Sequence, residues 1–342
     1  MATLELGLDT FGDVTTDAAG HPLSQAQSIR NLVEQAVLAD ELGVDFIGVG
    51  EHHRADFAVS APEVVLAGIA TRTTRIKLGS AVTVLSSDDP VRVFERFSTV
   101  DALSQGRAEV IIGRGSFTES FPLFGLDLAD YQQLFEEKID LFSRLIGNEA
   151  VTWEGTVRGS LADQHVYPKL EEGTLRTWVG VGGSPESVVR AAHYGLPLML
   201  AIIGGDPQRF APYADLYRRA LAQFGREELP IGAHSPGYIA VSDEQAREEL
   251  YPHFKANRDQ IGKERGWPPL SRAEYEQEVA SGALFVGSPE TVAQKIVRTV
   301  EGLGLSRFDL KYSNGTMPHE QLMSSIGLYG REVIPRVREL LG

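Results

Sequence analysis

Residues 108–120 read AEVIIGRGSFTES, an apolar run that passes directly into a glycine-rich turn. The run from Ala108 to Ile112 predicts a short buried strand. Gly113 and Gly115 would let the backbone approach a ligand closely, Arg114 offers a planar guanidinium for bidentate phosphate contacts, and Ser116 adds a hydroxyl. A motif this short fits either an ordinary strand-to-loop turn or an anion site, so the surrounding sequence must decide.

Short β-rich apolar runs alternate with longer amphipathic stretches along almost the whole chain. We expect strands near residues 5–9, 46–50, 77–84, 108–112, 177–181, 198–202, 237–241 and 308–311. We expect helices near residues 28–42, 62–72, 91–104, 130–146, 185–193, 208–224, 244–262 and 289–303. Eight strands in strict alternation with about eight helices favour an α/β fold of the TIM (β/α)8 barrel type over an open sheet.

Two stretches depart from this repeat, at residues 148–173 and 262–283. Long insertions in a barrel either form lids and pocket walls or make solvated excursions on the surface, and both interpretations stay open here. Residues 318–342 are expected to form one or two helices packed across the barrel. The prediction is therefore one barrel domain over residues 1–342, with two insertions and a C-terminal helical extension.

The composition limits the partners. The chain has 32 Lys and Arg residues against 47 Asp and Glu residues, a net charge of -15. This balance argues against nucleic acid or an anionic membrane as the main partner. With no cysteine, thiolate catalysis and iron–sulfur sites are excluded, and the first residues lack the pattern of a signal peptide. We expect a soluble, cytoplasmic protein.

Two expected helices begin with the same four residues, Gly-Ser-Pro-Glu, at residues 183–186 and 287–290. Serine as N-cap, proline at the first helical position and glutamate in the first turn predict a firm helix start. Such a helix end also suits a phosphate. The first start carries additional glycines and Ser187, but it matches a dinucleotide-binding fingerprint only partly, because Pro185 replaces the third glycine.

Glu51, His52 and His53 directly follow the second expected strand, where a barrel enzyme places its active-site loops. A histidine there can exchange protons near neutral pH. A structural role for both histidines is the alternative. A metal site is less favoured, because adjacent side chains on an extended segment point to opposite sides.

The third expected strand contains the small residues Ser80 and Ala81, which would either admit a flat ring or simply pack inside the barrel. Asp88 and Asp89 precede Pro90 and a long helix, so helix capping explains them better than paired-carboxylate catalysis. The sequence has neither a Gly-x-Ser-x-Gly elbow nor a Walker loop. The sequence therefore lacks the residues that these hydrolase and kinase motifs require.

Together these landmarks resemble the bacterial luciferase-like family of flavin monooxygenases, and the likeness runs along most of the chain. Each landmark is a weak signal, but their joint order is a strong one. They are, in chain order, Glu51-His52-His53, Gly79-Ser80-Ala81-Val82, Asp89-Pro90-Val91-Arg92, Gly106-Arg107, Gly113-Arg114-Gly115, Phe121-Pro122-Leu123-Phe124-Gly125, Val181-Gly182-Gly183-Ser184, Gly195-Leu196-Pro197 and Val286-Gly287-Ser288-Pro289-Glu290.

The resemblance implies an FMN site at the carboxyl ends of the strands. It implies that the phosphate is held by Arg114 and by the helix start containing Ser184 and Ser187. It implies that the isoalloxazine lies over a third-strand bulge with a non-proline cis peptide, here between Ala81 and Val82. Residues of the two glycine-rich turns complete the implied cofactor site: Gly115, Ser116 and Gly183.

The resemblance also implies the chemistry. The flavin is commonly supplied in reduced form by a separate NAD(P)H:flavin reductase, and O2 then oxidises a small organic substrate. His52 matches the family's active-site histidine, Glu51 would orient the loop or the flavin, and Phe117 with the two insertions could shield the site from water. The family is usually dimeric or larger, so a homodimer is expected.

Departures from the family pattern leave alternatives. Where luciferase carries a cysteine and an acidic residue near the flavin, this chain has Gly113 and Gly183, so light emission and a long aldehyde substrate are not expected. The nearest alternative is hydride transfer with the deazaflavin F420 on the same barrel. A different class is a flavin-binding protein that performs no turnover.

Overall fold

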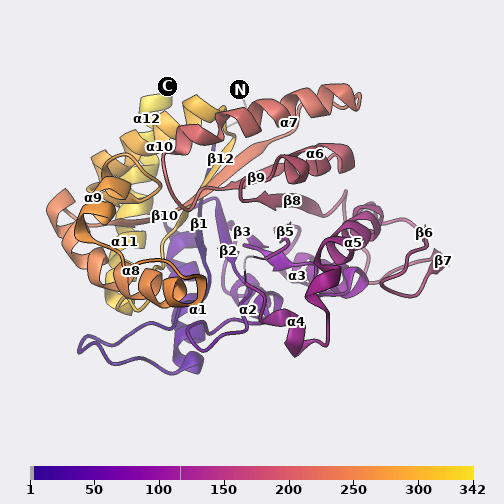
Figure 1. The fold of residues 1–342 in the computed structure, drawn as a ribbon, viewed down its shortest axis with the longest axis horizontal. Coiled ribbons are helices and arrows are strands. Elements are labelled where there is room, and N and C mark those ends of the chain that lie inside the picture. The colour runs from indigo at the N-terminus through magenta and orange to yellow at the C-terminus, as the bar shows by residue number, and fades with distance from the viewer. Residues whose placement is uncertain (1–3, 116) are drawn as a thin grey trace.

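The computed structural model describes residues 4–115 and 117–342, and it contains a closed barrel of eight parallel strands (Figure 1). Strand β10 pairs with both β9 and β12, which closes the sheet on itself. The predicted TIM-type barrel is therefore confirmed. Its strands are β1 (Glu5–Thr10), β2 (Phe46–Val49), β3 (Lys77–Ser80), β5 (Ala108–Gly113), β8 (Arg176–Val181), β9 (Leu198–Ala201), β10 (Ile231–Ile239) and β12 (Arg307–Lys311).

The third strand is shorter than expected. It stops at Ser80 and resumes as β4 (Thr83–Val84), which pairs with the end of β5. The peptide bond between the two pieces, Ala81–Val82, is cis. The family resemblance implied a cis peptide at this position, and the structure confirms it.

Helices surround the barrel (Figure 1), and six of the eight expected helices begin within one residue of the predicted start, whereas α1 begins three residues earlier and α7 three residues later than expected. Ser184 and Ser288 are N-caps that accept hydrogen bonds from the Ser187 and Thr291 amides, and Asp89 caps α3. The helices around the strands are α1 (Gln25–Glu41), α2 (Pro62–Ala70), α3 (Pro90–Ser104), α4 (Ser120–Leu123), α5 (Tyr131–Leu145), α6 (Pro185–Tyr194), α7 (Ala211–Gln223), α8 (Asp243–Arg265) and α10 (Pro289–Leu303), with 3-10 turns at Leu128–Asp130 and Pro207–Phe210.

The prediction that the seventh strand covers residues 237–241 is wrong. Strand β10 begins at Ile231 and ends at Ile239, and residues 231–236 make the pairings that close the barrel. Its first half contains Gly232, His234 and Pro236, which obscure the apolar pattern of a buried strand. The end of β10 pairs instead with a short additional strand, β11 (Phe285–Gly287).

The two insertions differ in structure. Residues 148–173 contain the antiparallel hairpin of β6 (Val151–Trp153) and β7 (Leu161–Gln164), which projects away from the barrel (Figure 1). Residues 262–283 contain the end of α8 and the helix α9 (Arg272–Ala280). The C-terminal extension is helical as predicted, with α11 (His319–Leu328), a π-helical turn (Tyr329–Val333) and α12 (Ile334–Leu341).

Buried ionic groups fill the barrel at the amino ends of its strands. Arg307 on β12 is fully buried and donates hydrogen bonds to Glu109 at 3.0 Å and to Asp309 at 2.9 Å. Its guanidinium also lies 3.5 Å from the centre of the Phe46 ring. These groups fill the barrel interior between the amino ends of its strands.

Within residues 4–115 and 117–342, none of the helices has both the length and the hydropathy needed to cross a bilayer.

Candidate functional site

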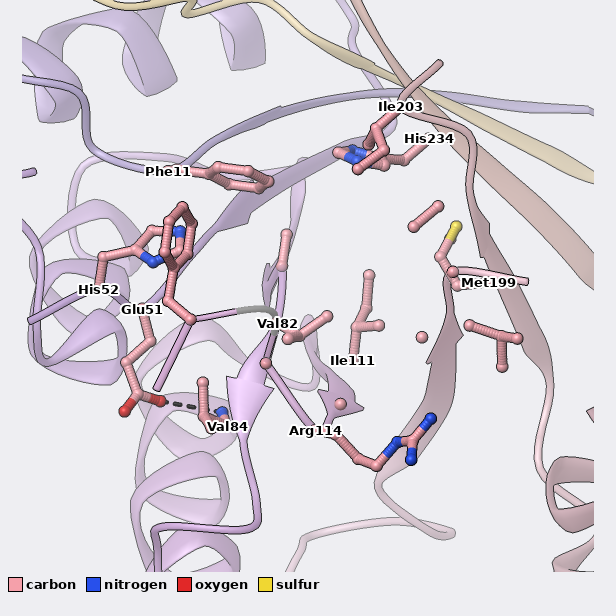
Figure 2. A pocket seen from close by; sticks show the side chains of 18 of the residues that line it. Phe11, Glu51, His52, Val82, Val84, Ile111, Arg114, Met199, Ile203 and His234 are labelled. Atoms are coloured by element: carbon pink, nitrogen blue, oxygen red, sulfur yellow. Dashed lines mark hydrogen bonds between the residues drawn. The ribbon is translucent and has the colours of Figure 1, made fainter. Parts of the chain in front are cut away.

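A cavity of about 480 Å³ opens at the carboxyl ends of the barrel strands, and Figure 2 shows it from close by. This volume lies within the range of roughly 300–1,000 Å³ typical of ligand sites. Every described residue that the sequence assigned to the site lines this cavity: Glu51, His52, Ala81, Val82, Arg114, Gly115, Gly183, Ser184 and Ser187. The remaining assigned residue, Ser116, lies outside the described residues.

Arg114 extends from the end of β5 toward the start of α6. Its Nη2 donates a hydrogen bond to Ser187 Oγ at 3.3 Å, and its Nη1 donates to Gln132 Oε1 at 3.2 Å. The guanidinium also lies 5.6 Å from the centre of the Tyr131 ring. Within the described part of the chain Arg114 forms no ion pair, so neutral groups hold it and its charge remains available to an anion.

The start of α6 supplies further groups for the same anion. Ser184 is the N-cap, Ser187 lies one turn into the helix, and Gly183 has a φ of +113°, a backbone conformation that favours glycine. The positive end of the helix dipole and the exposed amides of the first turn favour a negatively charged group at this point. An arginine and two hydroxyls at a helix start fit the phosphate of FMN.

The cis segment forms an apolar platform beside this phosphate seat. Ala81 and Val82 pack against a buried cluster of Phe46, Ile111, Trp178 and Met199. Ala81 lines the cavity, whereas Ser80 is fully buried and its hydroxyl donates to the Ile111 carbonyl at 3.1 Å. Ser80 therefore packs inside the barrel, whereas Ala81 borders the open space.

Two glycines make room for the Val82 side chain. A Cβ atom at Gly113 would lie 2.8 Å from Val82 Cγ2, and one at Gly180 would lie 3.1 Å from Val82 Cγ1. Contacts this short force the neighbour to move. The glycine at position 113, where luciferase itself carries a cysteine, is thus explained locally by the valine that faces it.

Glu51 connects the loop after β2 to the segment after the cis peptide. The carboxylate is 8% exposed; Oε2 accepts a hydrogen bond from the Val84 amide at 3.0 Å, and Oε1 lies 2.9 Å from His53 Nε2. The hydrogen bond to Glu51 raises the pKa of His53, although burial opposes the shift. Glu51 therefore holds the loop after β2 against the segment that contains Val84. His53 is the second partner of the same carboxylate.

His52 lies among aromatic rings. Its ring centre is 4.3 Å from that of Phe57, 5.1 Å from Phe117 and 5.2 Å from Phe11. Its Nδ1 is 3.8 Å from a carboxylate oxygen of Glu119. Burial would raise the pKa of Glu119, but the facing His52 and the charge of Arg54 hold it below its ordinary value. His52 and His53 have different partners, which does not suit a shared metal ion.

A second polar group in the cavity wall was not predicted from the sequence. His234 on β10 and Asp9 on β1 line the cavity, with His234 Nδ1 2.6 Å from Asp9 Oδ2. Phe11 contacts both histidines, because its ring centre is 5.2 Å from that of His52 and 5.9 Å from that of His234. Asp9 could have been found from the sequence, because it is an acidic residue at the end of an apolar strand. His234 was not recognised, because the seventh strand was expected at residues 237–241.

The insertions contribute unequally to the cavity. None of residues 148–173 lines it, so the expectation that this insertion shields the site is wrong. The second insertion lies closer. The guanidinium of Arg265, at the end of α8, lies 5.1 Å from the Phe117 ring centre, and Glu264 pairs with Arg54 at 2.6 Å. Phe117 itself lines the cavity.

Comparison with known proteins places the chain in a described family. The family model for luciferase-like monooxygenases matches residues 10–307. The alkanal monooxygenase alpha chain of Photorhabdus luminescens is 25% identical over 366 residues, with coverage of 96% of this chain and 97% of that protein. Limonene 1,2-monooxygenase of Rhodococcus erythropolis is 35% identical over 256 residues, which cover 71% of this chain and 65% of that protein.

Solved structures share the fold. Monooxygenase RslO1 from Streptomyces bottropensis has a TM-score of 0.83 and 23% identity, over 97% of this chain and 99% of its own. The oxygenating constituent of 3,6-diketocamphane monooxygenase from Pseudomonas putida, in complex with FMN, has a TM-score of 0.78 and 18% identity over 98% and 99%. The F420-dependent tetrahydromethanopterin reductase of Methanopyrus kandleri has a TM-score of 0.72 and 17% identity over 98% and 100%.

Proposed function

The chain belongs to the luciferase-like monooxygenase family, and we propose that it uses reduced FMN and O2 to oxidise a small organic substrate. We further propose that residues 1–342 act as one domain, that the protein is a cytoplasmic homodimer, and that a separate NAD(P)H:flavin reductase supplies the flavin in reduced form. The reductase and the homodimer follow from the family resemblance, the location follows from the cysteine-free sequence, and the use of FMN is also supported by the geometry of the cavity.

The observation that carries the FMN assignment is the position of Arg114. Its guanidinium hydrogen-bonds to Ser187 at the start of α6, with neutral partners only among the described residues. A phosphomonoester placed there would receive charge-assisted hydrogen bonds from Arg114 and lie at the positive end of the helix. Gly115 and Gly183 allow the backbone to approach that group from two turns.

The remaining residues divide the work of the site. Reduced FMN, when bound, would supply the electrons that activate O2 for insertion of one oxygen atom. Ala81 and Val82 would contact the flat ring of the flavin. Glu51 holds the segment that follows them through its hydrogen bond with the Val84 amide. His52 is the group that would donate or accept a proton at the reacting centre, since its imidazole lines the cavity.

Aromatic side chains around His52 support the same function. Phe11 and Phe117 line the cavity, and Phe57 packs on the imidazole. Rings in these positions exclude water from the space beside the platform, where the substrate would be oxidised. A substrate that enters this space must itself be largely apolar.

The test of this proposal uses the purified apo protein in parallel titrations with FMN and with F420, in oxidised and reduced forms. FMN binding with weak F420 binding supports the proposal, and the reverse order favours hydride transfer with F420. The bound reduced flavin is then mixed with aerated buffer. An enzyme should consume O2 before the oxidised flavin spectrum returns, whereas a simple binding protein should show both events together.

The His52→Ala variant separates proton transfer from binding. It should reduce turnover while the FMN dissociation constant changes little, because the phosphate seat lies on other strands. A matched control is His165→Ala, whose side chain is exposed on the projecting hairpin. Full turnover in the His52 variant would reduce that residue to a structural role.

A further inference from the structure

Asp9 and His234 form a buried pair in the cavity wall that the proposed function does not use. They belong to β1 and β10, and their exposed fractions are 1% and 8%. Asp9 Oδ2 lies 2.6 Å from His234 Nδ1. Figure 2 shows His234 across the cavity from Arg114, with Phe11 between His234 and His52. The pair is therefore remote from the phosphate seat and borders the space left for a substrate.

The contact with Asp9 determines which nitrogen of His234 carries a proton. A carboxylate only accepts hydrogen bonds, so Nδ1 donates to Asp9 and the neutral ring keeps a lone pair on Nε2. In the part of the chain that the structure describes, no residue hydrogen-bonds to Nε2, and Asp9 Oδ1 is buried without a partner. A carboxylate in this position also stabilises the imidazolium that forms when Nε2 takes up a proton.

The surroundings of the pair are mostly apolar. Ala201 is the register partner of His234 on β9, and Met199, Ile203 and Phe11 line the same part of the cavity. The other register partner, on β12, is Asp309, which is held by Arg307. The adjacent strands contribute three charged groups near His234: Asp9, Asp309 and Lys311, which is the register partner of Asp9 and has its Nζ 4.6 Å from the centre of the Phe11 ring. This part of the wall therefore presents Nε2 of His234 beside the apolar side chains of Met199, Ala201 and Ile203.

We propose that Asp9 and His234 act as a base toward the substrate, and that the substrate is an apolar molecule bearing an acidic hydroxyl, a phenol or an enol. The O–H bond of this hydroxyl breaks as its proton moves to His234 Nε2, and the electron pair stays on oxygen. The resulting anion is more electron-rich and accepts an electrophilic oxygen atom more readily. The imidazolium later returns the proton to the product oxygen.

This proposal rests on the proposed function, because the base acts on a substrate that FMN and O2 oxidise. Binding of a phenol nevertheless has a readout that needs no turnover. The probe is 4-nitrophenol, whose visible absorbance reports the phenolate form alone. It is added to the full-length protein, with and without oxidised FMN, at a series of pH values, next to a parallel FMN titration.

We expect the wild-type protein to lower the apparent pKa of the bound probe by about one unit, a roughly tenfold increase in the phenolate-to-phenol ratio. His234→Gln and Asp9→Asn should both lose this increase and keep wild-type FMN affinity. His165→Gln, a substitution at an exposed histidine, should keep the increase.

Absence of probe binding to the wild-type protein, binding of the neutral phenol without enhancement, or enhancement that survives His234→Gln would each overturn the assignment. The wild-type measurement alone can do so, even where a variant fails to fold. Failure of FMN to bind while the phenolate enhancement is present would overturn the proposed function instead.

Discussion

Glu51 Oε2 accepts a hydrogen bond from the backbone amide of Val84 at 3.0 Å, which ties the loop after the second barrel strand to the segment that follows the cis peptide. Glu51→Ala should therefore destabilise the protein, because it leaves the Val84 amide and the His53 ring without their acceptor. We expect a loss of about 2–4 kcal/mol in the free energy of unfolding, measured by urea denaturation. Glu95→Ala, which removes a surface ion pair with Arg92, is the control and should cost less than about 1 kcal/mol.

The stabilising contact of His53 should depend on pH. The hydrogen bond to Glu51 raises the pKa of His53 above 6.5 in the folded state. A raised folded-state pKa means that the stabilisation is complete below the unfolded value, about 6.5, and is lost as the pH rises through the folded value. The stability difference between wild type and His53→Gln should therefore be larger in acidic than in alkaline buffer. An equal difference at all pH values would contradict the assignment.

Gly113 is required by the side chain of Val82. Gly113→Ala places a Cβ atom 2.8 Å from Val82 Cγ2 and should displace the platform, with a loss of about 1–3 kcal/mol in unfolding free energy. Gly182→Ala is the matched control, because nothing lies within 4 Å of its added Cβ. Thermal unfolding of both variants checks the prediction, and similar melting temperatures would refute it.

Arg307 neutralises two buried carboxylates at the amino ends of the barrel strands. Arg307→Met should destabilise the fold by about 3–5 kcal/mol, because Asp309 loses its buried cation and Glu109 is left with the more distant Arg176 at 3.6 Å. The exposed pair of Arg336 and Glu290 provides the comparison, and Arg336→Met should cost less than about 1 kcal/mol. Chemical denaturation of the two variants measures the difference.

Local signals in the sequence predict much of this fold. The Gly-Ser-Pro-Glu starts at residues 183 and 287 predict where α6 and α10 begin, because capping is decided by neighbouring residues. The seventh strand was misplaced, since His234 and Pro236 interrupt its apolar pattern while strand pairing on both sides stabilises it. Tertiary pairing outweighed local propensity at that point.

Part of the candidate site could also be predicted from the sequence. Arg114 and the α6 start could be recognised as anion-binding groups from their own segments. The pair of Asp9 and His234 could not, because 225 residues separate the two partners and only barrel closure brings them together. The position of residues 148–173 away from the cavity could not be predicted either, because the length of an insertion does not determine the direction in which it projects.

The phosphate role of Arg114 is the central claim, and a comparison of FMN with riboflavin tests it most directly. Riboflavin has the same ring system and lacks the phosphate. Titration of wild-type protein and of Arg114→Ala with both ligands, next to Arg92→Ala as an exposed-arginine control, gives the affinities. We expect Arg114→Ala to weaken FMN binding roughly 10- to 100-fold and to leave riboflavin binding unchanged. Equal affinities of the variant and wild type for FMN, or an equal loss for both ligands, would contradict the account.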